Sequence, residues 1–199
     1  MRIGSLQTGN NFLNGTLDDV RLYDRILTAG EIAALVAPPA APTNLVATIG
    51  DGNVALSWSA ASNTASYYVK RSTTSGSGYV NIATNATLTF TNTGLNNGTL
   101  YYFVVSAVNV SGESTNSAPV SARPTSFAPT QLGFATVGNQ LQLNWPTNHT
   151  GWLLQAQTNA PGVGLGTNWV MLSGSELTNS FILPVNPANG SVFLRLISP

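Results

Sequence analysis

The stretch that decides the fold is LNNGTLYYFVVSAVNVSGES, residues 95–114. Every second residue from Tyr101 to Ala107 is apolar or aromatic, so these side chains share one face of an extended strand. The same alternation recurs in NVALSW (53–58) and in QLQLNW (140–145). Clusters of Gly, Asn, Ser and Pro separate the runs at short intervals, as in an antiparallel sandwich. The sequence therefore predicts an all-β protein.

Two proline-rich stretches, 37–44 and 122–130, divide the chain. Proline-rich segments are extended and semi-rigid, so we expect spacers there. The predicted organisation is a first piece at 1–37, a linker at 38–41, a domain at 42–124, a linker at 125–130 and a second domain at 131–199.

The two predicted domains resemble each other. GNVALSWSA in the first matches GNQLQLNWPT in the second, and YYVKRSTTSGSGYVNIA (67–83) parallels WLLQAQTNAPGVGLGTNWVMLS (152–173). Each copy predicts a strand, a Gly-rich hairpin loop, and a strand that opens on an aromatic residue. We interpret this as a weak internal repeat, with two immunoglobulin-like sandwiches in tandem.

Residues 42–124 resemble a fibronectin type III domain. The resemblance rests on Pro42 and Leu45 in the first strand, Trp58 at the end of the second, YYVKRS as the third, and the stretch 95–114. In that family the tyrosine six residues after the leucine, here Tyr101 after Leu95, bonds back to the corner before it. Trp58 is expected to supply the largest apolar burial. The resemblance implies a spacer or interaction module, and without an Arg-Gly-Asp tripeptide it gives no support to integrin adhesion.

Residues 127–199 resemble a short C-terminal module of large exported bacterial proteins. The matching residues are LNWPTNHTGWLLQAQTN, which contains Trp145, then GLGTNWV and NGSVFLRLIS. The segment VFLRLIS aligns with the sixth strand of the preceding domain, so we expect a truncated sandwich without a seventh strand. Its unpaired edge would either pair with a partner or be protected by Arg195 and Pro199.

Residues 1–37 resemble the closing end of a laminin-G-like, concanavalin-type jelly roll, in which a final strand leads into a short helix. Thr28 and Glu31 form a capping box that predicts a helix at about 29–36, ended by Pro38 and Pro39. So short a piece is below the size at which a domain usually folds alone. We therefore expect Met1 to be internal to a longer protein whose signal peptide lies upstream.

The acidic residues of the first piece invite a catalytic or calcium-binding interpretation. Asp18 and Asp19 are adjacent on a predicted strand and point to opposite faces, so they cannot act as a catalytic pair. We expect Asp18 to accept hydrogen bonds from a neighbouring loop or, alternatively, to contribute to a calcium site. Asp24 and Arg25 are expected to be solvated, and Glu31 is used by the capping box.

Other chemical motifs are weak. His149 is the only histidine and has no nucleophile or ligand at a useful spacing. PGVGLGTN (161–168) precedes a predicted strand rather than the helix that a phosphate loop requires, so it predicts a hairpin loop. The sequence thus predicts no catalytic residue, no metal ligand and no cofactor.

Composition narrows the function further. Charged residues make up only 7%, with seven basic and seven acidic side chains, which argues against nucleic-acid binding. Cysteine is absent, and the longest apolar run, LYYFVV, is too short to span a membrane. A surface rich in Asn, Ser, Thr and Gly suits an extracellular or cell-surface protein.

Tyr79, Trp152 and Trp169 are the candidates for stacking on sugar rings, and the alternative for each is core packing. The predicted function is that of a non-catalytic C-terminal region of a larger exported protein. It would act as a spacer or interaction module, with polysaccharide or cell-surface glycan as the partner. One alternative is an accessory region of a secreted glycan-degrading enzyme whose catalytic domain lies upstream, and another is a structural component of a filament or envelope.

Overall fold

The computed structural model describes residues 22–186 and 189–199. The chain divides into two compact units, residues 1–36 and 37–199. In the first unit the described residues form one helix, α1 (Ala29–Leu35), one residue shorter than expected. Asp18, Asp19 and most of the predicted strand lie outside the described residues, so the jelly-roll resemblance remains a sequence-based prediction.

Helix α1 begins at the predicted capping box. Thr28 Oγ1 accepts a hydrogen bond from the Glu31 backbone N–H at 3.3 Å, and the Glu31 carboxylate accepts one from the Thr28 N–H at 2.8 Å. Arg25, which we expected to be solvated, is exposed and also donates two hydrogen bonds to the same carboxylate, at 3.0 and 2.6 Å. Arg25 first, and then Thr28, lower the pKa of Glu31 to about 2. Glu31 is therefore committed to the start of the helix.

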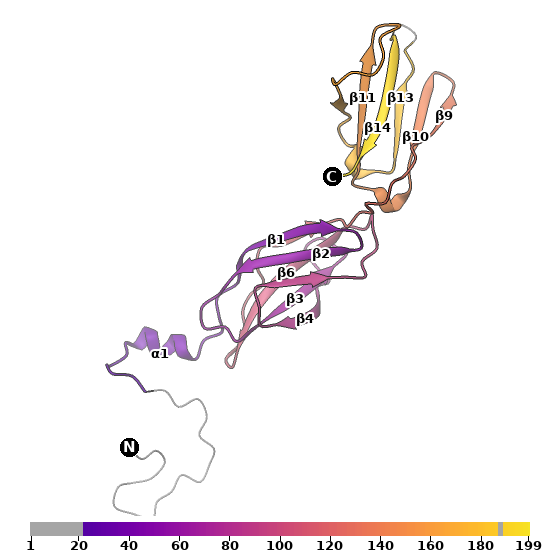
Figure 1. The fold of residues 1–199 in the computed structure, drawn as a ribbon. Helices are drawn as coiled ribbons and strands as arrows, with labels where there is room; N and C mark the ends of the chain where they lie inside the picture. The colour runs from indigo at the N-terminus through magenta and orange to yellow at the C-terminus, as the bar shows by residue number, and fades with distance from the viewer. Residues whose placement is uncertain (1–21, 187–188) are drawn as a thin grey trace, which may run out of the picture. The chain divides into compact units, whose positions relative to one another are not determined.

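Residues 43–122 form the first sandwich, which has two antiparallel sheets (Figure 1). One sheet has the order β1-β2-β5, made of β1 (Thr43–Gly50), β2 (Asn53–Ser59) and β5 (Thr89–Asn92). The other has the order β4-β3-β6, and β7 and β8 both pair with β6; it contains β3 (Ser66–Ser72), β4 (Val80–Asn85), β6 (Tyr101–Asn109), β7 (Gly112–Glu113) and β8 (Val120–Ala122).

The core of the first sandwich comes from the alternating residues that predicted its strands. Val54, Leu56 and Trp58 project from β2, and Phe103 and Val105 project from β6. Trp58 is 5% exposed and meets the Tyr67 ring edge-on at 5.6 Å between centroids. A large aromatic side chain contributes most when it is buried in this way.

Tyr101 closes the corner before β6. Its hydroxyl accepts a hydrogen bond from the Asn96 backbone N–H at 3.2 Å, next to the buried Leu95. Removing this bond in Tyr101→Phe is expected to lower the free energy of unfolding by roughly 0.5–1.5 kcal/mol, because the Asn96 N–H loses its protein partner. Urea denaturation measures the loss. An unchanged midpoint would show that the bond contributes nothing to stability.

The second sandwich repeats the strand order of the first. One sheet has the order β9-β10-β13, made of β9 (Gly133–Val137), β10 (Gln140–Asn144) and β13 (Ser180–Pro184). The other has the order β12-β11-β14, made of β11 (Leu153–Asn159), β12 (Val170–Met171) and β14 (Ser191–Ile197). Two 3-10 helices, η1 (Thr147–His149) and η2 (Ser175–Leu177), lie between strands.

One backbone contact supports the internal repeat. The Trp58 N–H donates to the Leu88 carbonyl, directly before β5, at 3.1 Å. The Trp145 N–H donates to the Asn179 carbonyl, directly before β13, at 3.0 Å. Each tryptophan therefore ties the end of one strand to the start of its neighbour in the same sheet.

The two sandwiches differ at one sheet edge. In the first, β6 pairs with β3 on one side and with β7 and β8 on the other. In the second, β14 pairs with β11 and, within the described residues, with no other strand. This is the arrangement expected of a sandwich without its seventh strand.

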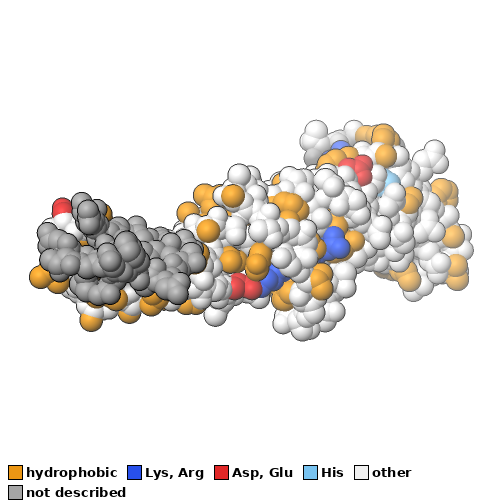
Figure 2. Space-filling view, turned by 90° about the horizontal axis from the view of Figure 1, so that it is seen from below, with side chains coloured by type: hydrophobic (Ala, Val, Ile, Leu, Met, Phe, Trp, Pro, Cys, Tyr) orange, Lys and Arg blue, Asp and Glu red, His pale blue; other side chains and the backbone are white. Residues whose placement is uncertain are grey.

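The surface carries few charges. In the view of Figure 2, the acidic and basic side chains are few, some of them lie side by side, and wide areas of uncharged polar and apolar atoms surround them. Among the described residues, no helix has the length and apolarity needed to cross a membrane.

Candidate functional site

The two sandwiches of the second unit meet at a junction whose buried backbone is hydrogen-bonded on both sides. The segment after β8 was predicted as a linker from residue 125, yet Pro124, Thr125 and Ser126 are all buried. Thr125 is 0% exposed. Buried backbone must find hydrogen-bond partners, so the contacts of this segment decide how firmly it is held.

The second sandwich supplies several of these partners. The Ser126 N–H donates to the Asn148 carbonyl at 2.8 Å, and the Trp152 indole N–H donates to the Ser126 carbonyl at 2.8 Å. His149 is 4% exposed, with Nε2 at 2.8 Å from the Ala128 carbonyl. Its ring meets the Trp152 ring edge-on at 4.9 Å. Two aromatic side chains therefore hold the segment by its backbone.

The first sandwich holds the segment from the other side. The Gly98 N–H donates to the Pro124 carbonyl at 2.8 Å, and Arg123 donates to the Gly98 carbonyl at 2.6 Å. A Cβ added at Gly98 would fall under 3.0 Å from the Thr147 backbone oxygen, so the two sandwiches approach closely at this glycine. Such a junction can fix a separation between domains, because both sides bond to the same few residues.

The sugar-stacking candidates lie in different surroundings. Trp152 is 8% exposed and belongs to the junction, which leaves its ring no open face. Tyr79 is partly buried, and its hydroxyl has no hydrogen-bond partner within the described residues. Trp169 is partly exposed, and the Arg195 guanidinium lies over its ring at 4.1 Å. The three side chains do not form one site, and sugar stacking at Tyr79 or Trp169 stays a prediction from the sequence.

The motifs that could have suggested a catalytic, metal or phosphate site make structural contacts instead. His149 serves the junction, and the described part of the chain contains no group of three or more His, Asp or Glu side chains that could hold a metal. The loop at 161–168 is fastened to β11, since the Gly166 N–H donates to Gln157 Oε1 at 3.1 Å and Asn159 donates to the Gly164 carbonyl at 2.6 Å. These contacts are those of a hairpin loop held against its own sheet.

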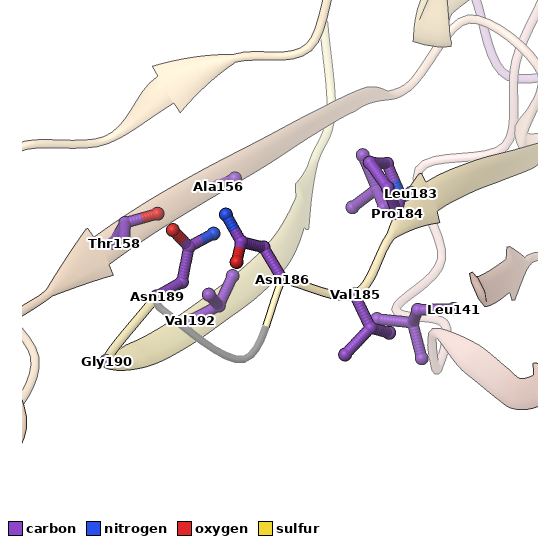
Figure 3. Close-up of a pocket in the computed structure, with 10 residues that line it drawn as sticks. All are labelled: Leu141, Ala156, Thr158, Leu183, Pro184, Val185, Asn186, Asn189, Gly190 and Val192. Atoms are coloured by element: carbon purple, nitrogen blue, oxygen red, sulfur yellow. The ribbon is translucent and has the colours of Figure 1, made fainter. Parts of the chain in front are cut away.

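A pocket of about 500 Å³ opens between the sheets of the second sandwich. In Figure 3, Thr158, Asn186 and Asn189 lie on one side and the apolar Leu141 and Leu183 on the other. The described residues that line it carry no ionisable side chain.

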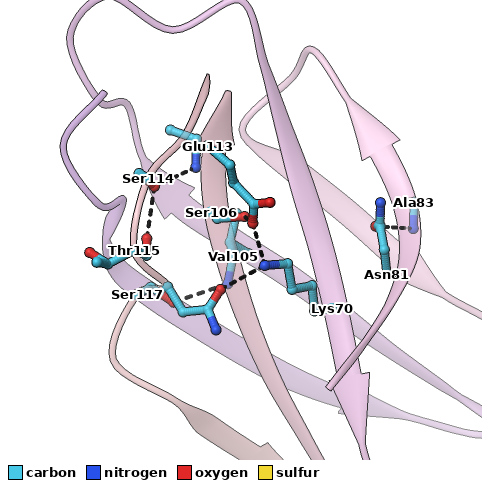
Figure 4. A network of polar contacts seen from close by, with 11 residues as sticks. Lys70, Asn81, Ala83, Val105, Ser106, Glu113, Ser114, Thr115 and Ser117 are labelled. Carbon is cyan, nitrogen blue, oxygen red and sulfur yellow. Dashed lines mark hydrogen bonds and ion pairs between the residues drawn. The ribbon is translucent and has the colours of Figure 1, made fainter. Parts of the chain in front are cut away.

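A polar network on the first sandwich joins β3, β6 and β7. Figure 4 shows the Glu113 carboxylate between Lys70, with which it forms an ion pair, and the Ser106 hydroxyl, which donates to it at 2.6 Å. Lys70 also donates to Asn116 at 2.9 Å. Lys70 first, and then Ser106, lower the pKa of Glu113.

This network predicts a pH-dependent contribution to stability. Because the folded pKa of Glu113 is depressed, its contribution is complete above the ordinary value of 4.5 and is lost as the pH falls through the folded value. Glu113→Gln is therefore expected to be less stable than the parent at neutral pH, and the difference should shrink below pH 4.5. Urea midpoints across that range measure the difference. A constant difference would exclude the ionised carboxylate as its cause.

Comparison with known proteins identifies the middle of the chain. The family model described as "Fibronectin type III domain" matches residues 40–123, close to the predicted 42–124. A structure titled as an Fn3-like protein from Clostridium thermocellum is 42% identical and covers 47% of this chain and 100% of its own, with a TM-score of 0.42.

Curated relatives are enzymes much longer than this chain. The amylopullulanase of Thermoanaerobacter thermohydrosulfuricus is 37% identical over 128 residues, which is 63% of this chain and 8% of the enzyme. That of Thermoanaerobacterium saccharolyticum is 37% identical over 106 residues, or 53% of this chain and 8% of the enzyme. The chain thus spans less than a tenth of these relatives.

Proposed function

We propose that this chain, whose residues 40–123 form a fibronectin type III domain, is a non-catalytic accessory region of a larger glycan-degrading enzyme. The observation that carries the proposal is the similarity to a small part of two amylopullulanases. It favours the alternative raised by the sequence, an accessory region of a glycan-degrading enzyme, over a spacer or adhesion region of another kind of exported protein. In such an enzyme the region would work outside the cell, and catalysis would belong to other domains.

Within that enzyme the region acts as a spacer that does not bend freely at its centre. The junction supports this role, because Ser126 bonds to Asn148 and Trp152 on one side while Pro124 bonds to Gly98 on the other. A flexible linker would leave its backbone to water. A junction whose backbone is buried and hydrogen-bonded instead restrains the orientation of one sandwich relative to the next.

Affinity electrophoresis of the chain in gels containing soluble starch or pullulan tests the spacer role against sugar binding. We expect migration relative to a non-binding reference protein to be the same with and without glycan, and incubation with either glycan to release no reducing ends. Release of reducing ends by the pure chain would overturn the non-catalytic assignment. Retardation that disappears in Trp169→Ala would replace the spacer role with binding at Trp169.

A further inference from the structure

The free edge of β14 is the strongest unexplained feature of the second sandwich. In the first sandwich the corresponding strand, β6, is covered along this edge by β8, and β8 also contacts β1. In the second, β14 offers its backbone N–H and C=O groups along Ser191–Ile197, and the described residues place no strand beside them. An unpaired strand edge is a template for pairing with another strand.

One exposed apolar side chain lies on β9, the strand that corresponds to β1, which β8 contacts in the first sandwich. Phe134 pairs with Leu143, which is 2% exposed, so Phe134 lies on the face of β9 that is turned toward the core. Phe134 is nevertheless 76% exposed. Counted from the equivalent Trp58 and Trp145, it corresponds to Ala47, which packs against the core of the first sandwich. A large aromatic side chain thus stands where the other sandwich is covered by β8.

Arg195 and Pro199, which the sequence suggested as protection for this edge, do not cover it. Arg195 Nε donates to Gln155 Oε1 at 2.9 Å, and its guanidinium lies over Trp169. Both partners belong to the β11 and β12 side of the sheet, opposite the free edge. Pro199 lies beyond the last residue of β14. Within the described part of the chain, no strand pairs with the outer backbone groups of β14.

We propose that this edge binds β14 of a second copy of the chain, antiparallel, to join the two sheets across a twofold axis. The strand is self-complementary in one register. With Leu194 opposite Leu194, all residues of β14 are paired, and Phe193 faces Arg195 of the other copy. Shifting the centre to Arg195 would set two guanidinium groups opposite each other, which is unfavourable.

The faces of β14 also match in this register. Val192 and Leu196, which are on the core side with Leu194, would lie opposite each other between copies. The added strand would bring these side chains toward Phe134, as β8 does for β1. The formal net charge is zero, so no overall repulsion opposes association of two copies. Because such a pairing is isologous, it closes at a dimer and leaves no growing end.

Sedimentation velocity of the full chain over a wide concentration range tests the proposal. We expect a reversible monomer–dimer equilibrium. Phe134→Ser should weaken dimerisation by about tenfold or more, since it removes from each copy an aromatic side chain that the dimer would bury. Val137→Ser is the matched control, because Val137 is 55% exposed on the opposite face of the same strand.

Hydrogen exchange locates the interface. Amides of Ser191–Ile197 should exchange more slowly as the chain concentration rises, and those of β12, on the other edge of the sheet, should not. A monomer at every concentration would overturn the proposal. So would equal effects of Phe134→Ser and Val137→Ser, or concentration-dependent protection confined to another surface. This inference does not depend on which enzyme the region serves.

Discussion

Trp58→Ala is expected to destabilise the first sandwich by about 3–5 kcal/mol, the cost typical of removing a buried tryptophan. Trp58 is 5% exposed, contacts Tyr67, and lies among the largest cluster of buried side chains. Total stabilities of single domains are about 5–15 kcal/mol, so the variant should lose a large share of the stability of its domain. Urea denaturation monitored by circular dichroism measures the loss.

Trp58→Phe is the matched control. The indole N–H of Trp58 is buried and finds no hydrogen-bond partner among the described residues, so phenylalanine keeps much of the ring while it removes an unpaired donor. We expect a cost under about 1.5 kcal/mol. Equal losses in the two variants would mean that the indole itself, rather than the volume it fills, holds the core together.

Gly98→Ala is expected to release the two sandwiches from each other. Gly98 has φ +81°, and its added Cβ would fall under 3.0 Å from the Thr147 backbone oxygen. A backbone oxygen cannot swing away as a flexible side chain can, so the junction must open. We expect the variant to lose about 1–2 kcal/mol from left-handed strain and about 1–3 kcal/mol more from overpacking.

NMR relaxation can separate junction opening from general destabilisation. In the parent, both sandwiches should tumble with one rotational correlation time, and in Gly98→Ala each should tumble faster on its own. Gly94→Ala is the control, because Gly94 has φ +69° but nothing within 4 Å of an added Cβ. Gly94→Ala should lose stability through left-handed strain, but its two sandwiches should keep one common rotational correlation time. Equal tumbling times in the two variants would contradict the role of Gly98.

Sequence patterns predicted most of the local structure, for identifiable physical reasons. The alternation through Tyr101 and Phe103 predicted β6, and the capping box at Thr28 and Glu31 predicted the start of α1. Both signals are local, since side chains alternate along a strand and a cap spans only a few residues. The all-β fold class follows from the same alternation repeated along the chain.

The junction could not be predicted in this way. Proline-rich composition indicated a spacer at 125–130, but the burial of Thr125 and Ser126 depends on Asn148 and Trp152, which are more than twenty residues away in the chain. The sequence indicated a loop residue at His149 and either a sugar-stacking or a core residue at Trp152, but not that both side chains bind the segment after β8. The one local signal was Gly98. That this position requires a glycine becomes evident only in the tertiary structure, where the Thr147 backbone lies against it.

By itself, the sequence determined the strands, the turns, the helix cap and the repeat of one sandwich pattern, because each depends on neighbouring residues and on their periodic burial. Only the tertiary structure decided that the segment after β8 is buried, that Arg195 turns toward Trp169, and that Phe134 is exposed on the core-facing side of β9. These features depend on which surfaces meet, and a contact between distant residues leaves no period in the sequence.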